Sequence, residues 1–142
     1  MSGATAIVVA LLLPLCGAPI IALLGRRPNL RETATVITAL ATFAVVCTLA
    51  PKVAAGAQPA VHLIEVFPGL ALVFQVEPLG MLFALVASGL WIATSIYAIG
   101  YMRGHHEENQ TRFFLFFAVA ISAALGVAFA GNMLTLFFCY EA

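Results

Sequence analysis

The chain has 142 residues, of which 63% are hydrophobic and only 8% are charged. About a quarter of the residues in a soluble domain are charged, so this composition excludes an ordinary soluble protein and indicates an integral membrane protein. The formal net charge is zero, so no basic excess suggests nucleic acid and no acidic excess suggests a solvating tail.

Long apolar segments follow one another along the chain, with short polar breaks between them. Residues 4–24 carry no charge and are long enough to cross a hydrocarbon core, which takes about 20 residues of helix. Further segments cover residues 33–50, 79–101 and 113–130, and a partial one begins at residue 133. Lipid offers no partner to open backbone groups, so these segments are predicted to be helices. The predicted fold class is an all-α integral membrane protein: a single membrane domain with four transmembrane helices and a partial fifth (133–142).

The first segment has no Lys or Arg ahead of its apolar core. We therefore expect a retained span and not a cleaved signal peptide. Cys16, Cys47 and Cys139 fall within apolar segments, are odd in number and have no close spacing. This pattern predicts neither a disulfide framework nor a metal site, and the three cysteines are interpreted as small apolar side chains.

The connection at residues 51–78 has the pattern of a β-hairpin. Pro68 and Gly69 separate two apolar arms, as the turn of a hairpin does. Alternate positions of the second arm form an apolar face, made of Leu70, Leu72, Phe74 and Val76. That face requires a partner, and two remain open: the helix ends of the same chain or an adjacent subunit. His62 and Glu65 on this hairpin are expected to be solvated.

The basic residues predict the orientation in the membrane. All five arginines precede the second apolar segment or lie between the third and fourth, at positions 26, 27, 31, 103 and 112. Lys52 alone is on the opposite side. By the positive-inside bias, the arginine-containing loops face the cytoplasm, and the amino terminus and the hairpin are external.

The fourth segment carries small side chains at every fourth position: Ala118, Ser122, Gly126 and Ala130. Such a stripe lets helix backbones approach closely in lipid. We therefore predict that these four residues serve helix packing inside a bundle.

The polar loop after the third segment holds His105, His106, Glu107 and Glu108. Sequence neighbours diverge on a helix and no third ligand group is nearby, so a hydrated loop is favoured over a metal site. The chain has no phosphate-binding glycine motif, nucleophile elbow or dinucleotide fingerprint. No catalytic site and no cofactor are therefore predicted for this chain.

Glu141 is the one carboxylate that follows a long apolar run without a break. If the fifth helix begins after Asn132, a plausible cap, a rise of about 1.5 Å per residue places Glu141 roughly 13 Å into a core about 30 Å thick. An ionised carboxylate at that depth costs at least roughly 2.5 kcal/mol. It must be protonated, face water or pair with a cation. Glu141 is therefore the predicted residue of a proton or ion pathway.

Four stretches resemble the amino-terminal region of antiporter-like subunits, which occur in respiratory complex I, in Mrp cation/proton antiporters and in membrane-bound hydrogenases. They are Val76-Glu77-Pro78-Leu79-Gly80-Met81-Leu82-Phe83, Ile99-Gly100-Tyr101-Met102-Arg103, Gln110-Thr111-Arg112-Phe113-Phe114 and the run from Gly131 to Glu141. The resemblance implies proton or sodium translocation. It also implies that Glu141 matches a fifth-helix glutamate which, in that family, pairs with a lysine on a later helix.

Members of that family continue through further helices that carry the partner lysine, and Lys52 in the external loop matches none of those positions. We therefore expect a fragment of a longer subunit, or a chain completed by a second polypeptide, in a bacterial or archaeal cell membrane. The expected partners are other membrane subunits, H⁺ or Na⁺, and the lipid bilayer, without nucleic acid. Two alternatives remain open: a non-transporting membrane scaffold or assembly protein, and a small oligomeric four-helix exporter.

Overall fold

The computed structural model describes all residues from Met1 to Ala142. It contains five helices and one two-stranded sheet, in the order α1 (Gly3–Leu23), α2 (Pro28–Ala54), β1 (Ala60–Phe67), β2 (Leu70–Gln75), α3 (Pro78–Gly104), α4 (Gln110–Ala128) and α5 (Met133–Glu141). The helices α1 to α4 are each long and apolar enough to cross a membrane. The predicted fold class, with four such helices, a short fifth helix and a hairpin between the second and third, is confirmed.

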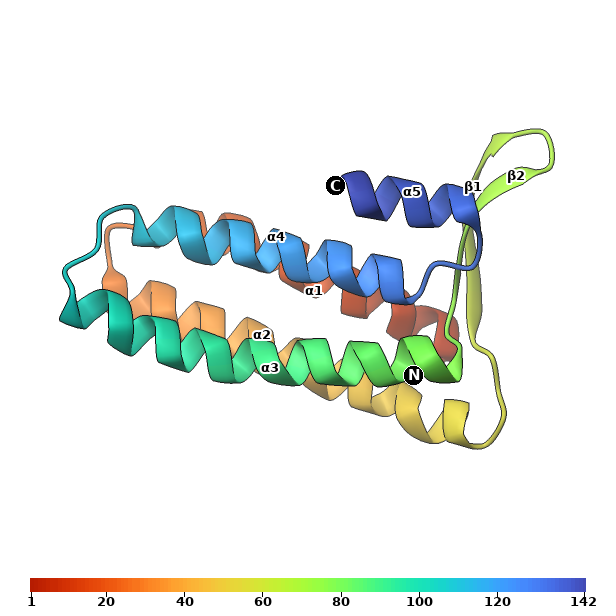
Figure 1. The fold of residues 1–142 in the computed structure, drawn as a ribbon, viewed down its shortest axis with the longest axis horizontal. Coiled ribbons are helices and arrows are strands. Elements are labelled where there is room, and N and C mark those ends of the chain that lie inside the picture. The colour runs from red at the N-terminus through yellow and green to blue at the C-terminus, as the bar shows by residue number, and fades with distance from the viewer.

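The four long helices lie alongside one another (Figure 1). Their short connections, between α1 and α2 and between α3 and α4, share one end of the bundle, while the hairpin stands at the other end (Figure 1). The helix α5 turns back from the hairpin end and runs beside α4. The five arginines, which lie in or next to these two connections, are therefore at one end of the bundle, as their spacing predicts.

Helix α2 begins at Pro28 and not at residue 33, where the apolar segment starts. Proline is well suited to the first turn of a helix, because its missing N–H would have no helical partner there. The early start places Arg31 and Glu32 inside the helix, where both are buried. The charged residues that bound the apolar segment are thus part of the packed bundle.

The hairpin has the predicted turn, with β1 and β2 antiparallel and Gly69 at a φ of 83° between them. Its base packs on helix ends of the same chain: the Gln75 N–H donates to the Phe129 carbonyl at 2.7 Å, and Phe74 and Val76 are buried. Its tip is different, because Phe67 remains 61% exposed. Of the two partners considered for the apolar face, the chain's own helix ends cover the base only.

Two close approaches fix α4 in the bundle. At one end, a Cβ built on Gly80 of α3 would lie 2.1 Å from the carbonyl oxygen of Ala128. Near its middle, the Ser122 hydroxyl donates to the Leu11 carbonyl of α1 at 2.7 Å. Helix α4 ends at Ala128, so Ala130 lies beyond it and forms an isolated bridge with Phe74.

Candidate functional site

The start of α5 is fixed by polar contacts with the hairpin. The Asn132 side-chain oxygen accepts the Thr135 N–H at 2.8 Å, which confirms Asn132 as the cap. Its Nδ2 donates to the Ala71 carbonyl at 2.6 Å, and the Val73 N–H donates to the Thr135 hydroxyl at 2.9 Å. Thr135 is fully buried. The strand β2 therefore sets the position from which α5 begins.

Glu141 is the last residue of α5. The helix has one face on the bundle, through the buried Thr135 and the half-buried Cys139, whereas Phe137, Phe138 and Glu141 are exposed. The carboxyl end of the chain lies beside the bundle, well away from both of its ends (Figure 1). The side chain of Glu141 makes no hydrogen bond or ion pair within the chain.

The small residues of α4 lie against two neighbouring helices. Ala118, Ser122 and Gly126 are buried, and Ser122 bonds to α1. A Cβ built on Gly126 would lie 2.6 Å from the Cys139 Sγ of α5. Gly126 thus permits the close approach of the helix that carries Glu141.

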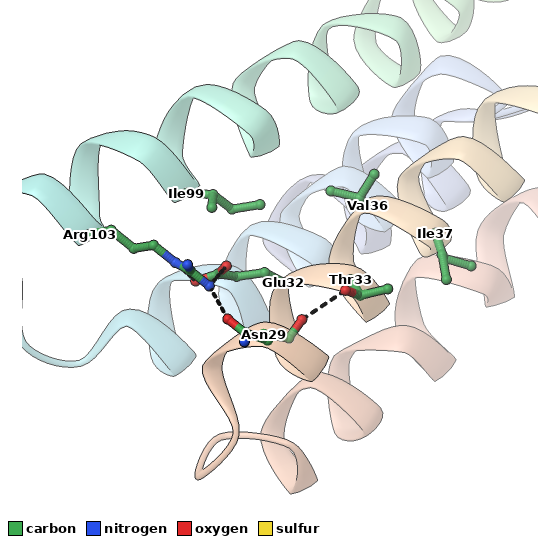
Figure 2. A pocket seen from close by; sticks show the side chains of 7 residues that line it. All are labelled: Asn29, Glu32, Thr33, Val36, Ile37, Ile99 and Arg103. Carbon is green, nitrogen blue, oxygen red and sulfur yellow. Dashed lines mark hydrogen bonds and ion pairs between the residues drawn. The ribbon is translucent and has the colours of Figure 1, made fainter.

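A cluster of charged side chains, which hydropathy alone does not predict, lies at the end of the bundle opposite the hairpin. Arg103 of α3 donates from Nε to Glu32 Oε1 at 3.0 Å and from Nη2 to Glu32 Oε2 and Asn29 Oδ1. Figure 2 shows Arg103 reaching across from α3 to these two residues of α2. The Glu32 side chain is only 7% exposed. We call Arg31, Glu32 and Arg103 the charge cluster.

Arg31 extends the charge cluster to α4. Its Nη1 donates to the Thr111 hydroxyl at 3.1 Å and its Nη2 to Gln110 Oε1 at 2.8 Å, while the guanidinium lies over the Phe114 ring at 5.5 Å. A weaker contact of 3.4 Å joins it to Glu32. Buried charges are tolerated when they are paired and hydrogen-bonded. Here the Glu32 carboxylate is paired with the guanidinium groups of both Arg31 and Arg103. The cluster joins α2, α3 and α4.

Pro28 is the residue in the sequence that could have indicated the burial of Arg31 and Glu32. Interpreted as the first residue of a helix, it places Arg31 and Glu32 one turn inside the helix and not in the preceding loop. From the sequence, Arg31 and Arg103 indicate only the orientation of the chain, but in the structure both are also partners of Glu32.

The remaining polar candidates lie apart from one another. Glu65 accepts the Gly69 N–H at 3.0 Å within the hairpin, and the His105 ring stacks on Tyr101 at the end of α3. His62 is exposed on β1. No three His, Cys, Asp or Glu side chains are grouped as metal ligands, and the three cysteines are free.

Comparison with known proteins supports the family resemblance. Residues 69–114 match the family model described as NADH-ubiquinone oxidoreductase (complex I), chain 5 N-terminus. The resemblance to antiporter-like subunits is thereby confirmed. The matched segment covers β2, α3 and the beginning of α4, and it includes Gly80 and Arg103. No curated protein matches the chain.

The fold is also found in a solved structure, that of the membrane-bound sulfane sulfur reductase, an archaeal respiratory membrane complex. One of its chains superposes with a TM-score of 0.77 at 20% sequence identity, over 94% of this chain. The present chain spans only 20% of the length of that chain. The match shows a shared fold.

Proposed function

We propose that this chain forms part of a proton- or sodium-translocating membrane subunit and that Glu141 is the carboxylate it contributes to the ion pathway. The observation that carries the proposal is the placement of Glu141 at the outer face of α5, without a partner in the chain. The family match over residues 69–114 supplies the context of a complex I-like assembly.

Glu141 lies on a helix that runs beside the membrane-spanning bundle, where charge is costly. A carboxylate on a lipid-facing helix is expensive, and such groups face water or pair with a cation. Glu141 has no cation beside it in this chain, so the rest of the assembly must provide it with water or a cation. A lysine on another helix of the assembly would supply such a cation.

The scaffold alternative makes a different prediction for the same residue. A protein that only supports assembly would tolerate Glu141→Ala, since the side chain is exposed and makes no hydrogen bond or ion pair within the chain. The experiment is to introduce Glu141→Ala into the complete assembly and to measure both its yield and ion translocation in sealed vesicles. Glu108→Ala, which removes an exposed carboxylate in the loop before α4, is the matched control.

The proposal expects normal yield and strongly reduced translocation for Glu141→Ala, with both quantities unchanged for Glu108→Ala. Normal translocation by Glu141→Ala would favour the scaffold. Loss of yield in Glu141→Ala alone would assign the residue to assembly and would contradict a role in the pathway.

A further inference from the structure

A groove lies between α2 and α3 at the end of the bundle where the charge cluster is found. Its volume is about 440 Å³, and Figure 2 shows the residues around it: Asn29, Glu32, Thr33, Val36, Ile37, Ile99 and Arg103. The groove opens on the outside of the bundle, where Ile37 is 60% exposed. In a membrane this face meets lipid or a neighbouring protein.

The mouth of the groove has hydrogen-bond donors that the chain does not use. Arg103 Nε and Nη2 are bonded to Glu32 and Asn29, but Arg103 Nη1 and Asn29 Nδ2 donate to nothing in the chain. The Arg103 side chain is 49% exposed, so these donors are accessible. The single carboxylate of Glu32 is shared between two guanidiniums, and the charge cluster keeps one positive charge. The mouth is therefore complementary to an anion.

The walls of the groove are apolar further along the helices. Val36 and Ile37 lie about two turns beyond Asn29 on α2, which is roughly 10–12 Å along the axis, and Ile99 lies one turn before Arg103 on α3. A soluble anion would use the mouth and leave these walls bare. A molecule with a phosphate at one end and a hydrocarbon chain at the other would use both.

We propose that this groove binds one anionic phospholipid, with its phosphate on Arg103 Nη1 and Asn29 Nδ2 and an acyl chain along Val36, Ile37 and Ile99. Basic pockets between transmembrane helices are suited to anionic headgroups, and one basic side chain near the surface strengthens such binding by about fivefold. The site is separate from Glu141, which lies on a different helix, and it does not depend on the proposed ion pathway.

The first test counts lipids retained by the complete assembly in native mass spectrometry, after reconstitution with phosphatidylglycerol or phosphatidylcholine. We expect retention of phosphatidylglycerol in preference to phosphatidylcholine. Arg103→Gln should lower that retention about fivefold, whereas Arg112→Gln, an exposed arginine at the same end of the bundle, should leave it unchanged. Equal retention of phosphatidylglycerol by the wild type and Arg103→Gln would overturn the proposal.

A second variant keeps the test decisive if Arg103→Gln disturbs the charge cluster. Val36→Phe narrows the apolar part of the groove without changing a charge, and it should also lower retention of phosphatidylglycerol. Inorganic phosphate should fail to displace the lipid, because it cannot use the apolar walls. Displacement by inorganic phosphate would assign the mouth to a free anion and contradict a lipid site.

Photocrosslinking distinguishes the lipid from a protein occupant. With p-benzoylphenylalanine in place of Ile37, irradiation of the complete assembly should give a lipid adduct, identified by its mass. A crosslink to another polypeptide would show that a protein helix fills the groove and would overturn the proposal.

Discussion

Glu32 of α2 receives hydrogen bonds from both Nε and Nη2 of Arg103, which lies 71 positions later on α3. With Arg31 on its other side, this carboxylate joins three of the four long helices at one end of the bundle. The pairing explains how charged residues are accommodated in a helix that is otherwise apolar.

Replacement of Glu32 by Gln should destabilise the bundle, because it leaves the buried Arg31 guanidinium without a countercharge. Removing one partner of a buried pair costs about 3–5 kcal/mol, and we expect the lower end of that range because Arg31 keeps its bonds to Thr111 and Gln110. Unfolding of the purified protein in detergent would measure the loss. Glu108→Gln is the control at the same end and should change the stability by less than about 0.5 kcal/mol.

Gly80→Ala should disrupt the contact between α3 and α4. The added Cβ would meet the backbone oxygen of Ala128 at 2.1 Å, and a backbone atom cannot be moved by rotating a side chain. Overpacking of this kind costs about 1–3 kcal/mol. At Gly100, on the same helix, nothing lies within 4 Å of the corresponding position. Thermal unfolding of the two variants in detergent would compare them. Gly100→Ala should be neutral or stabilising in that assay, and equal losses at both sites would show that the close approach is wrong.

Asn132→Ala should loosen α5 without unfolding the bundle. The change removes the cap of the helix and the bond to Ala71, and the loss of a cap costs about 1 kcal/mol. Faster amide hydrogen exchange at residues 135–141 would report it, with the exchange of α1 unchanged. Asn109 begins α4 in a left-handed conformation, without a side-chain cap bond. Asn109→Gly is therefore the control and should leave the exchange of α5 as in the wild type.

The sequence predicted the features that follow from local chemistry. Apolar length identifies α1, α3 and α4 because each helix must bury its backbone groups in lipid, and Pro68-Gly69 identifies the hairpin because Gly69 adopts a positive φ. Asn132 was expected as a cap for the same local reason, since its side chain reaches a backbone N–H only three residues away.

The features that were missed depend on contacts distant in sequence. The burial of Glu32 is tolerated because Arg103 lies opposite it on another helix, and no local pattern around Glu32 indicates that pairing. Likewise, the docking of β2 on Phe129 and Thr135 is formed only when α4 and α5 are in place. Hydropathy separates apolar from polar segments, but it does not show which polar side chains meet.

The role of Glu141 in the ion pathway is tested most directly by the variant Glu141→Gln in the complete assembly. The quantity to measure is the initial rate of ion translocation into sealed vesicles, expressed per assembled complex. Glutamine keeps the shape of the side chain and removes its charge and its ability to exchange a proton. We predict a loss of about a hundredfold or more, since a positioned proton-transferring group typically contributes about 10²–10⁴-fold, with normal assembly. Translocation at the wild-type rate would contradict the assignment of Glu141 to the ion pathway.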